Sequence, residues 1–264
     1  MTKPRVVLVR ILVCGALLLR LDTAAAIDAW DKSSPADDTP ATGTELIHGS
    51  DAQHDLQGQE GAADVDWYRV SQQPFASYEF VVDAVSGAIA PPIVERIDSD
   101  GVTVLQSSQA VGPGIGGSRS LRWHNASAGA VEDEYIRVTS GGCSAKCKST
   151  AVYRLRFFDS PYSSARFNNS GTQVTVLLVQ NPQSYAIAGA VYLWNANGTS
   201  AGTQPFSVAA KNLLVFATQT IAPGVSGSIT VAHDGRYGDL SGKTVALEPA
   251  TGFSFDTSLE ARPH

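Results

Sequence analysis

Residues 152–158 read Val-Tyr-Arg-Leu-Arg-Phe-Phe, and this stretch indicates the fold class. Its apolar residues alternate with two arginines, Arg154 and Arg156. A period of two places the two kinds of side chain on opposite faces of an extended strand. The stretch therefore predicts a half-buried strand in an antiparallel sheet.

Upstream of this strand, short apolar segments are separated by turn signals. Residues 65–70 are aromatic and β-branched, and residues 77–85 place three apolar side chains on one face. The tetrapeptide Asp98-Ser-Asp-Gly101 predicts a tight turn between paired strands. We expect a hairpin from strands at 93–97 and 102–105, and further strands at 120–123 and 134–138.

A second strand series follows a short Pro- and Ser-containing boundary at residues 159–164. Strands are expected at 172–180, 187–194, 204–208, 213–220, 227–232 and 244–248. No segment longer than a turn shows helical periodicity. The pattern predicts an all-β protein with two consecutive antiparallel β-sandwiches.

The first 26 residues differ in kind from the rest. Lys3 and Arg5 precede an apolar run at 6–21, and Ala24-Ala-Ala26 forms a small-residue cleavage site. A transmembrane anchor is the alternative, but a span needs about 20 apolar residues and Arg10 interrupts this run. We interpret 1–26 as a signal peptide for export to the periplasm or the extracellular space, and 27–43 as a disordered linker.

The charge and the cysteine content limit which partners and which kinds of site this chain can have. Lys and Arg number 19 against 25 Asp and Glu, so no basic surplus favours nucleic acid as a partner. Loss of the leader leaves Cys143 and Cys147, which predict a disulfide in an oxidising compartment. A metal site is the alternative, but C-x-x-x-C alone cannot supply four ligands. Because the two cysteines precede the strand at 152–158, we expect their disulfide to lie at the tip of a hairpin.

One resemblance covers about residues 44–158. The stretches His54-Asp-Leu, Asp64-Val-Asp-Trp-Tyr-Arg-Val, Tyr78-Glu-Phe-Val-Val-Asp83 and Ile97-Asp-Ser-Asp-Gly101 together resemble the bacterial pre-peptidase C-terminal domain family. The resemblance implies a jelly-roll-like β-sandwich that serves exported proteins as an accessory, sometimes substrate-binding, module. The chain departs from the usual arrangement of that family, because no peptidase precedes the domain.

The second half is similar, in pattern only, to immunoglobulin-like accessory domains of bacterial surface proteins. That similarity extends over about residues 166–256. We therefore expect a jelly-roll-like sandwich at 44–158, an immunoglobulin-like sandwich at 163–258 and a short tail at 259–264.

The sequence gives little sign of a common catalytic motif. It has no H-E-x-x-H, and its histidines are scattered. The pair His233-Asp234 is the most suggestive, but the following Gly235 favours a turn. We predict no catalytic residue and no cofactor. A secreted hydrolase with a site assembled from dispersed carboxylates or histidines is the alternative.

Calcium is a weaker alternative for a bound ion. Asp64 and Asp66 alternate on one predicted strand, and Asp98 and Asp100 flank a turn, so all four are candidate oxygen ligands. The interpretation that we favour is that these carboxylates cap loops and form the turn.

Aromatic residues are the candidates for ligand binding. Trp123 lies between Arg122 and His124, and we expect it to be exposed, whereas Trp67 and Trp194 are expected in the core. Trp123, Arg122 and Tyr135 are therefore the predicted binding residues. The predicted function is a non-enzymatic exported accessory module that binds a glycan or a protein at the cell surface, or plays a structural role there.

Overall fold

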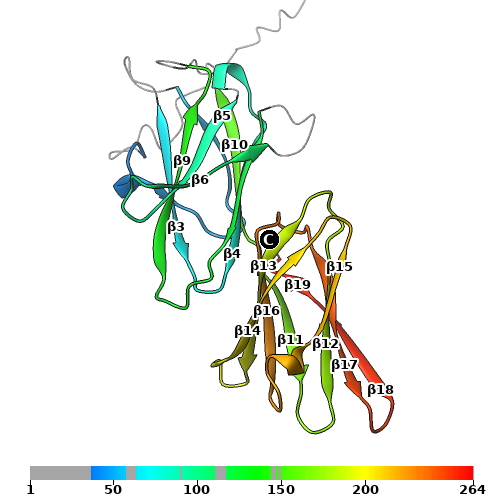
Figure 1. The fold of residues 1–264 in the computed structure, drawn as a ribbon. Helices are drawn as coiled ribbons and strands as arrows, with labels where there is room; N and C mark the ends of the chain where they lie inside the picture. Colours follow the sequence, from blue (N-terminus) through cyan, green and yellow to red (C-terminus); the bar gives the residue numbers. More distant parts are fainter. Residues whose placement is uncertain are drawn as a thin grey trace, which may run out of the picture.

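The computed structural model describes residues 37–57, 64–89, 91–110, 117–143, 147 and 150–263, which form two β-sandwiches in succession (Figure 1). The predicted signal peptide and residues 27–36 of the predicted linker lie outside these residues. The described elements are strands and three short 3-10 turns, so the all-β prediction is confirmed. In the described part of the chain, no helix is long and apolar enough to cross a membrane.

The first sandwich consists of two five-stranded sheets. One sheet, in spatial order, contains β1 (Thr44–Glu45), β3 (Val65–Gln72), β9 (Glu132–Ser140), β5 (Pro92–Ile97) and β6 (Val104–Ser107). The other contains β2 (Asp51–Asp55), β10 (Val152–Asp159), β4 (Ser77–Asp83), β8 (Arg119–His124) and β7 (Gln109–Ala110). All pairings are antiparallel except that of β1 with β3.

Alternation along the strands builds the first core. Tyr153, Leu155 and Phe157 on β10 are buried in it, while Arg154 and Arg156 face outward. The predicted hairpin also forms, as β5 pairs with β6 across the turn at 98–103. The short 3-10 turns η1 (Pro40–Thr42) and η2 (Gly87–Ile89) complete this sandwich.

The two cysteines form the predicted disulfide, with their Cα atoms 5.6 Å apart. Its predicted position is wrong, however. β9 pairs with β3 and β5, whereas β10 pairs with β2 and β4, so these consecutive strands belong to opposite sheets. The disulfide therefore lies in a connection that crosses from one sheet to the other and does not close a hairpin tip.

The second sandwich pairs a five-stranded with a four-stranded sheet. The first contains β14 (Ser200–Val208), β13 (Ile187–Asn195), β16 (Ser226–His233), β11 (Tyr162–Asn168) and β19 (Glu260–Ala261). The second, here called sheet D, contains β15 (Leu213–Ala217), β12 (Val174–Gln180), β17 (Ser241–Glu248) and β18 (Phe253–Ser258). The predicted strand at 213–220 ends at Ala217, and the 3-10 turn η3 (Thr218–Thr220) follows. Part of the predicted tail forms β19, which pairs with β11.

Aromatic side chains join the two sandwiches across a two-residue connection. Phe75, in the turn between β3 and β4, has a φ of 60°, an uncommon value for a non-glycine residue. Its ring centre lies 4.7 Å from that of Tyr192 and 5.0 Å from that of Trp194, both on β13. Phe158 stacks on Tyr237 at 4.8 Å. The two sandwiches therefore share packed aromatic contacts.

The end of the chain returns to this junction (Figure 1). Arg262 forms an ion pair with Asp159, and its carbonyl accepts the Tyr237 hydroxyl at 2.6 Å. The carbonyl of Pro263 lies 3.1 Å from Nε2 of His48 in the first sandwich. The last described residues thus help to hold the two sandwiches together.

Candidate functional site

A polar cleft lies where the two sandwiches meet, and it is the candidate functional site. Its volume is about 490 Å3, within the range of roughly 300–1,000 Å3 that is typical of small-molecule sites. The edge strand β7 and its neighbour β8 form one wall, and the turns before β13 and after β16 form the other. The larger polar side chains that line it include Gln109, Ser120, Arg122, Gln183, Tyr185 and Arg236.

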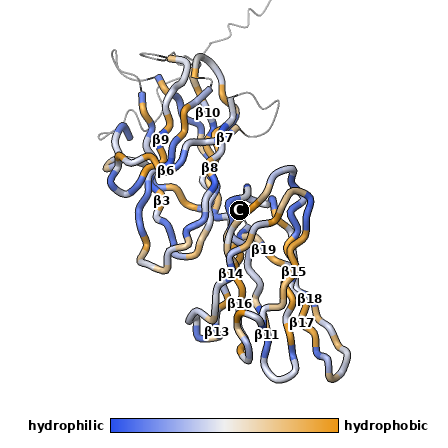
Figure 2. Tube along the Cα trace, viewed as in Figure 1, coloured by the Kyte–Doolittle hydropathy of each residue, from blue (hydrophilic) through white to orange (hydrophobic). Residues whose placement is uncertain are grey.

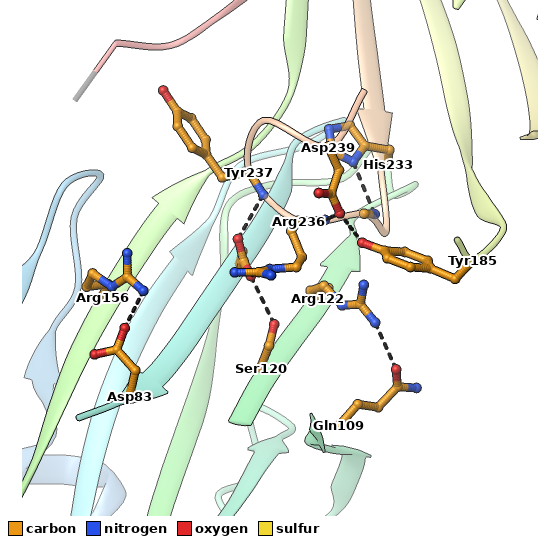
Figure 3. Close-up of polar contacts among 12 residues, drawn as sticks. Asp83, Gln109, Ser120, Arg122, Arg156, Tyr185, His233, Arg236, Tyr237 and Asp239 are labelled. Carbon is orange, nitrogen blue, oxygen red and sulfur yellow. Dashed lines mark hydrogen bonds and ion pairs between the residues drawn. The ribbon is translucent and has the colours of Figure 1, made fainter. Parts of the chain in front are cut away.

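Arg122 reaches the cleft from the outer face of β8. Its Nη2 donates to Oε1 of Gln109 at 2.8 Å, and its guanidinium carbon lies 4.8 Å from the centre of the Tyr185 ring (Figure 3). Among the residues that the structure describes, no carboxylate lies within ion-pair distance of Arg122. Its positive charge is therefore available to a ligand in the cleft.

Glu79 is a buried carboxylate that holds Arg236 in place by an ion pair. Its side chain is 3% exposed, and it accepts from Nε of Arg236 and Oγ of Ser120, each at 3.1 Å. The Tyr237 N–H donates to its second oxygen at 2.8 Å. Burial raises the pKa of Glu79, and the Tyr237 N–H and the Arg236 guanidinium oppose that rise. This carboxylate joins β4 of the first sandwich to the turn after β16 of the second.

Tyr185 is held in the cleft wall by Asp239. The tyrosine hydroxyl donates to Oδ2 of Asp239, which also accepts the Arg236 N–H at 2.8 Å. Burial and the nearby carboxylate raise the pKa of Tyr185 to about 12. The ring is therefore neutral at physiological pH and serves as a fixed surface beneath the Arg122 guanidinium.

His233 is buried behind the cleft and is engaged on both sides of its ring. Nδ1 accepts the Gly235 N–H at 3.1 Å, so Nε2 carries the proton and donates to the Ser160 carbonyl at 2.9 Å. Asp234 accepts the Ala188 N–H at 2.7 Å. The pair thus forms a turn that fixes the connection between the sandwiches, and it offers no base to a nucleophile.

Replacing Glu79 with alanine is expected to lower the free energy of unfolding by about 2 kcal/mol. The loss leaves the Tyr237 N–H and Ser120 without their acceptor, while Arg236 is 39% exposed and recovers water. Urea denaturation of the variant measures the change. Glu45→Ala is the matched control, because its exposed pair with Arg69 contributes at most about 1 kcal/mol. Equal losses in the two variants would contradict a special role for Glu79.

The prediction that Trp123 is exposed is wrong. Trp123 is 5% exposed and belongs to the first core. Its Nε1 donates to Oε1 of Gln72 at 2.8 Å, its ring packs 5.3 Å from that of Tyr78, and the Arg96 guanidinium lies 5.1 Å from its centre. Neighbouring positions on a strand face opposite sides, so Arg122 reaches the cleft while Trp123 points into the core.

Tyr135 and Arg122 do not share a site. Tyr135 is half-buried on β9 in the opposite sheet, with its ring 6.4 Å from that of Trp67. Trp67 is buried and Trp194 is partly buried against Phe75. Of the three predicted binding residues, the structure places only Arg122 in the cleft.

The four candidate calcium ligands all accept hydrogen bonds from other residues of the first sandwich. Asp100 accepts the N–H groups of Val102 and Thr103, each at 2.8 Å, and Asp98 accepts the Ser99 N–H. Tyr153 donates to Asp66, and Asp64 accepts the Val65 N–H at 2.9 Å. Within the described ranges, no three His, Cys, Asp or Glu side chains are grouped so that they could hold a metal ion. The calcium alternative stays a prediction without a grouped site.

The arrangement favours binding of a polar, acidic ligand. Two guanidinium groups, amide side chains and hydroxyls line the cleft, and these are donors suited to carboxylate and hydroxyl oxygens. The Asp234 carboxylate also lines the cleft, and Glu79 and Asp239 lie nearby; each of the three accepts a backbone N–H group. They are therefore engaged in holding the turns of the cleft.

Comparisons with known proteins give weak likenesses only. No family model and no curated protein matches the chain. Among solved structures, the pre-peptidase C-terminal domain of a collagenase from Bacillus anthracis is similar at a TM-score of 0.32 and 10% identity, over 44% of this chain and 93% of that one.

Two β-glucuronidases are also similar to longer parts of the chain. One from Bacteroides uniformis has a TM-score of 0.21 and 13% identity over 81% of this chain and 28% of its own. The other, from glycoside hydrolase family 2, has a TM-score of 0.19 and 14% identity over 86% of this chain and 26% of its own. The chain thus spans about a quarter of the length of these enzymes.

Proposed function

We propose that this protein is a non-catalytic binding module whose interdomain cleft holds an acidic glycan. The observation that carries the proposal is the Arg122 guanidinium, which has no ion-pair partner among the described residues and lies over Tyr185 in a cleft rich in amide and hydroxyl groups. Planar guanidinium groups pair well with carboxylate oxygens, and amides and hydroxyls match the ring hydroxyls of a sugar. A segment of a partner protein is the other occupant that the test distinguishes.

Export is part of the proposal. It is supported by the charged, apolar and small-residue segments of 1–26 and by the Cys143–Cys147 disulfide, which is typical of oxidising compartments. The motif residues at 64–70 and 97–101 further support a relationship of the first sandwich to the pre-peptidase C-terminal domains. An accessory module at the cell surface is consistent with both features.

Arg122→Ala is expected to weaken binding of an acidic glycan by about tenfold to a hundredfold, because a charge-assisted hydrogen bond is lost. The measurement is a titration of purified protein against paired glycans with and without their carboxylate or sulfate groups. Arg154→Ala is the matched control, since Arg154 pairs with Asp51 on β2, outside the cleft. Equal losses in both variants, or equal binding of neutral glycans, would overturn the assignment of this cleft.

The same experiment separates binding from catalysis. The bound glycan is recovered and its chain length is measured after long incubation. An unchanged glycan is the expected result. Shortened products would refute the non-catalytic proposal and would favour a hydrolase with dispersed catalytic residues. Binding to a partner protein but to no glycan would place a polypeptide in the cleft instead.

A further inference from the structure

β18 is an edge strand of sheet D, and its aromatic residues are exposed. It pairs with β17 in an unbroken register from Phe253 to Ser258, and no strand of the described residues pairs with its other side. Phe253 is 66% exposed and Phe255 is 68% exposed. Figure 2 shows orange, hydrophobic residues along this part of the second sandwich. An edge strand without Lys, Arg or Pro is a template for another strand.

The inner face of this hairpin lacks a covering strand. Phe253 and Phe255 lie opposite Glu248 and Ala246, on the side of sheet D that also carries the buried Thr244. Beyond Thr244 that side opens into a groove of about 170 Å3 between the hairpin and Arg166 of β11. The two rings therefore continue the core face beyond the point where the opposite sheet ends.

The hydrogen-bonding phase of β18 determines how a partner strand can pair. The Leu259 N–H donates to the Gly242 carbonyl at 2.9 Å, so odd-numbered residues direct their backbone groups to β17. Because the direction alternates, the N–H and C=O groups of Ser254, Asp256 and Ser258 point to the free edge. The side chains of these three residues lie on the face opposite to the two rings.

We propose that β18 pairs antiparallel with β18 of a second copy of this chain. A twofold axis at Phe255 places Ser254 opposite Asp256 of the other copy as a hydrogen-bonded pair. Phe255 then faces Phe255, and Phe253 faces Thr257, which are aromatic and aromatic–β-branched pairs that stabilise sheets. Moving the axis to Asp256 would set two carboxylates opposite each other, and moving it to Ser254 would bring the turn residue Gly252 into the pairing.

The available area predicts a weak dimer. Two rings that are two-thirds exposed supply on the order of 250 Å2 of aromatic surface per copy, below the roughly 800 Å2 per partner of a standard interface. Pairing of the two backbones buries some further surface, but it adds no aromatic contacts. Association is therefore expected at micromolar rather than nanomolar concentration, and sedimentation velocity over that range measures it.

Cysteine cross-linking tests the register directly. In a Cys14→Ser background, an equal mixture of Ser254→Cys and Asp256→Cys proteins is oxidised mildly. The proposed pairing places these two positions about 5.5 Å apart between Cα atoms, within the range of disulfides. Like positions lie roughly 8–9 Å apart, which is too far. The mixture should give covalent dimers, and each protein alone should give none.

Each other outcome overturns a stated part of the proposal. Cross-linking of Ser254→Cys alone or of Asp256→Cys alone would place the axis at that residue. Equal cross-linking in all three samples would indicate random collision. No cross-linking, together with monomeric sedimentation at hundreds of micromolar, would show that β18 does not pair with a second copy.

A backbone variant tests the edge hydrogen bonds. Ser254→Pro removes an N–H that points to the free edge, without removing a hydrogen bond to β17. It should weaken dimerisation by about tenfold or more, whereas Ser254→Ala keeps the N–H and should change it little. Equal dimerisation of these two variants, with unchanged circular dichroism, would overturn the strand pairing.

Discussion

Replacing Trp123 with alanine is expected to lower the free energy of unfolding by about 3–5 kcal/mol. Trp123 fills the first core against Tyr78, and its indole N–H satisfies the buried amide of Gln72. The alanine variant would leave a cavity and an unpaired amide oxygen together. Chemical denaturation followed by tyrosine fluorescence or circular dichroism measures the change.

Phe253→Ala is the matched control for this prediction, because it also truncates an aromatic ring to a methyl group. Its ring is exposed on β18, so its effect on unfolding at low protein concentration is expected to stay within about 0.5 kcal/mol. A Trp123→Ala protein that is as stable as wild type, but fails to bind a ligand, would contradict the buried position of this side chain.

Acidification is expected to destabilise the protein through His233. Burial lowers the pKa of His233 from 6.5 to about 4, and the charges of His124 and Arg122 act in the same direction. Between these pH values the unfolded chain binds a proton that the folded protein does not. Stability therefore falls as the pH falls from 6.5 to about 4, by about 3 kcal/mol in total.

The His233→Gln variant isolates this contribution. Glutamine offers a donor and an acceptor but does not titrate in this range. On going from pH 7 to pH 4, the unfolding free energy of the wild type should fall relative to that of the variant. Glu79 and Glu134 have raised pKa values and act in the opposite sense, but they are present in both proteins and cancel. A constant difference across this range would place the acid sensitivity at another group.

Alternation of apolar and polar residues was sufficient to predict most strands. β10 and β12 have periods of two that the structure reproduces, because one side of each strand packs against the opposite sheet. β18 was missed because all six of its residues are exposed, so packing does not explain its sequence. β11 was missed because only two residues separate it from the end of β10, so that it begins inside the predicted boundary.

The site was harder to predict, because it lies between two units that meet through their surfaces. Arg122 was identified, but with Trp123, its neighbour in sequence, which points the other way. Gln109, Tyr185 and Arg236 are contributed by three separate segments, and no local pattern relates them. The alternation along 77–85 also placed Glu79 on the outer face of β4, where a charge is ordinarily solvated. It is buried only because the second sandwich covers it.

The aromatic contacts at the junction limit how this chain can be divided. Phe75 and Phe158 each pack on the other sandwich, and Arg262 returns to Asp159. A chain that ended after Asp159 would present those two rings to water, and the second half alone would expose Tyr192 and Trp194. Each half would then expose a hydrophobic patch of the kind that leads to aggregation. The smallest piece that could be transferred intact between proteins is therefore the pair of sandwiches.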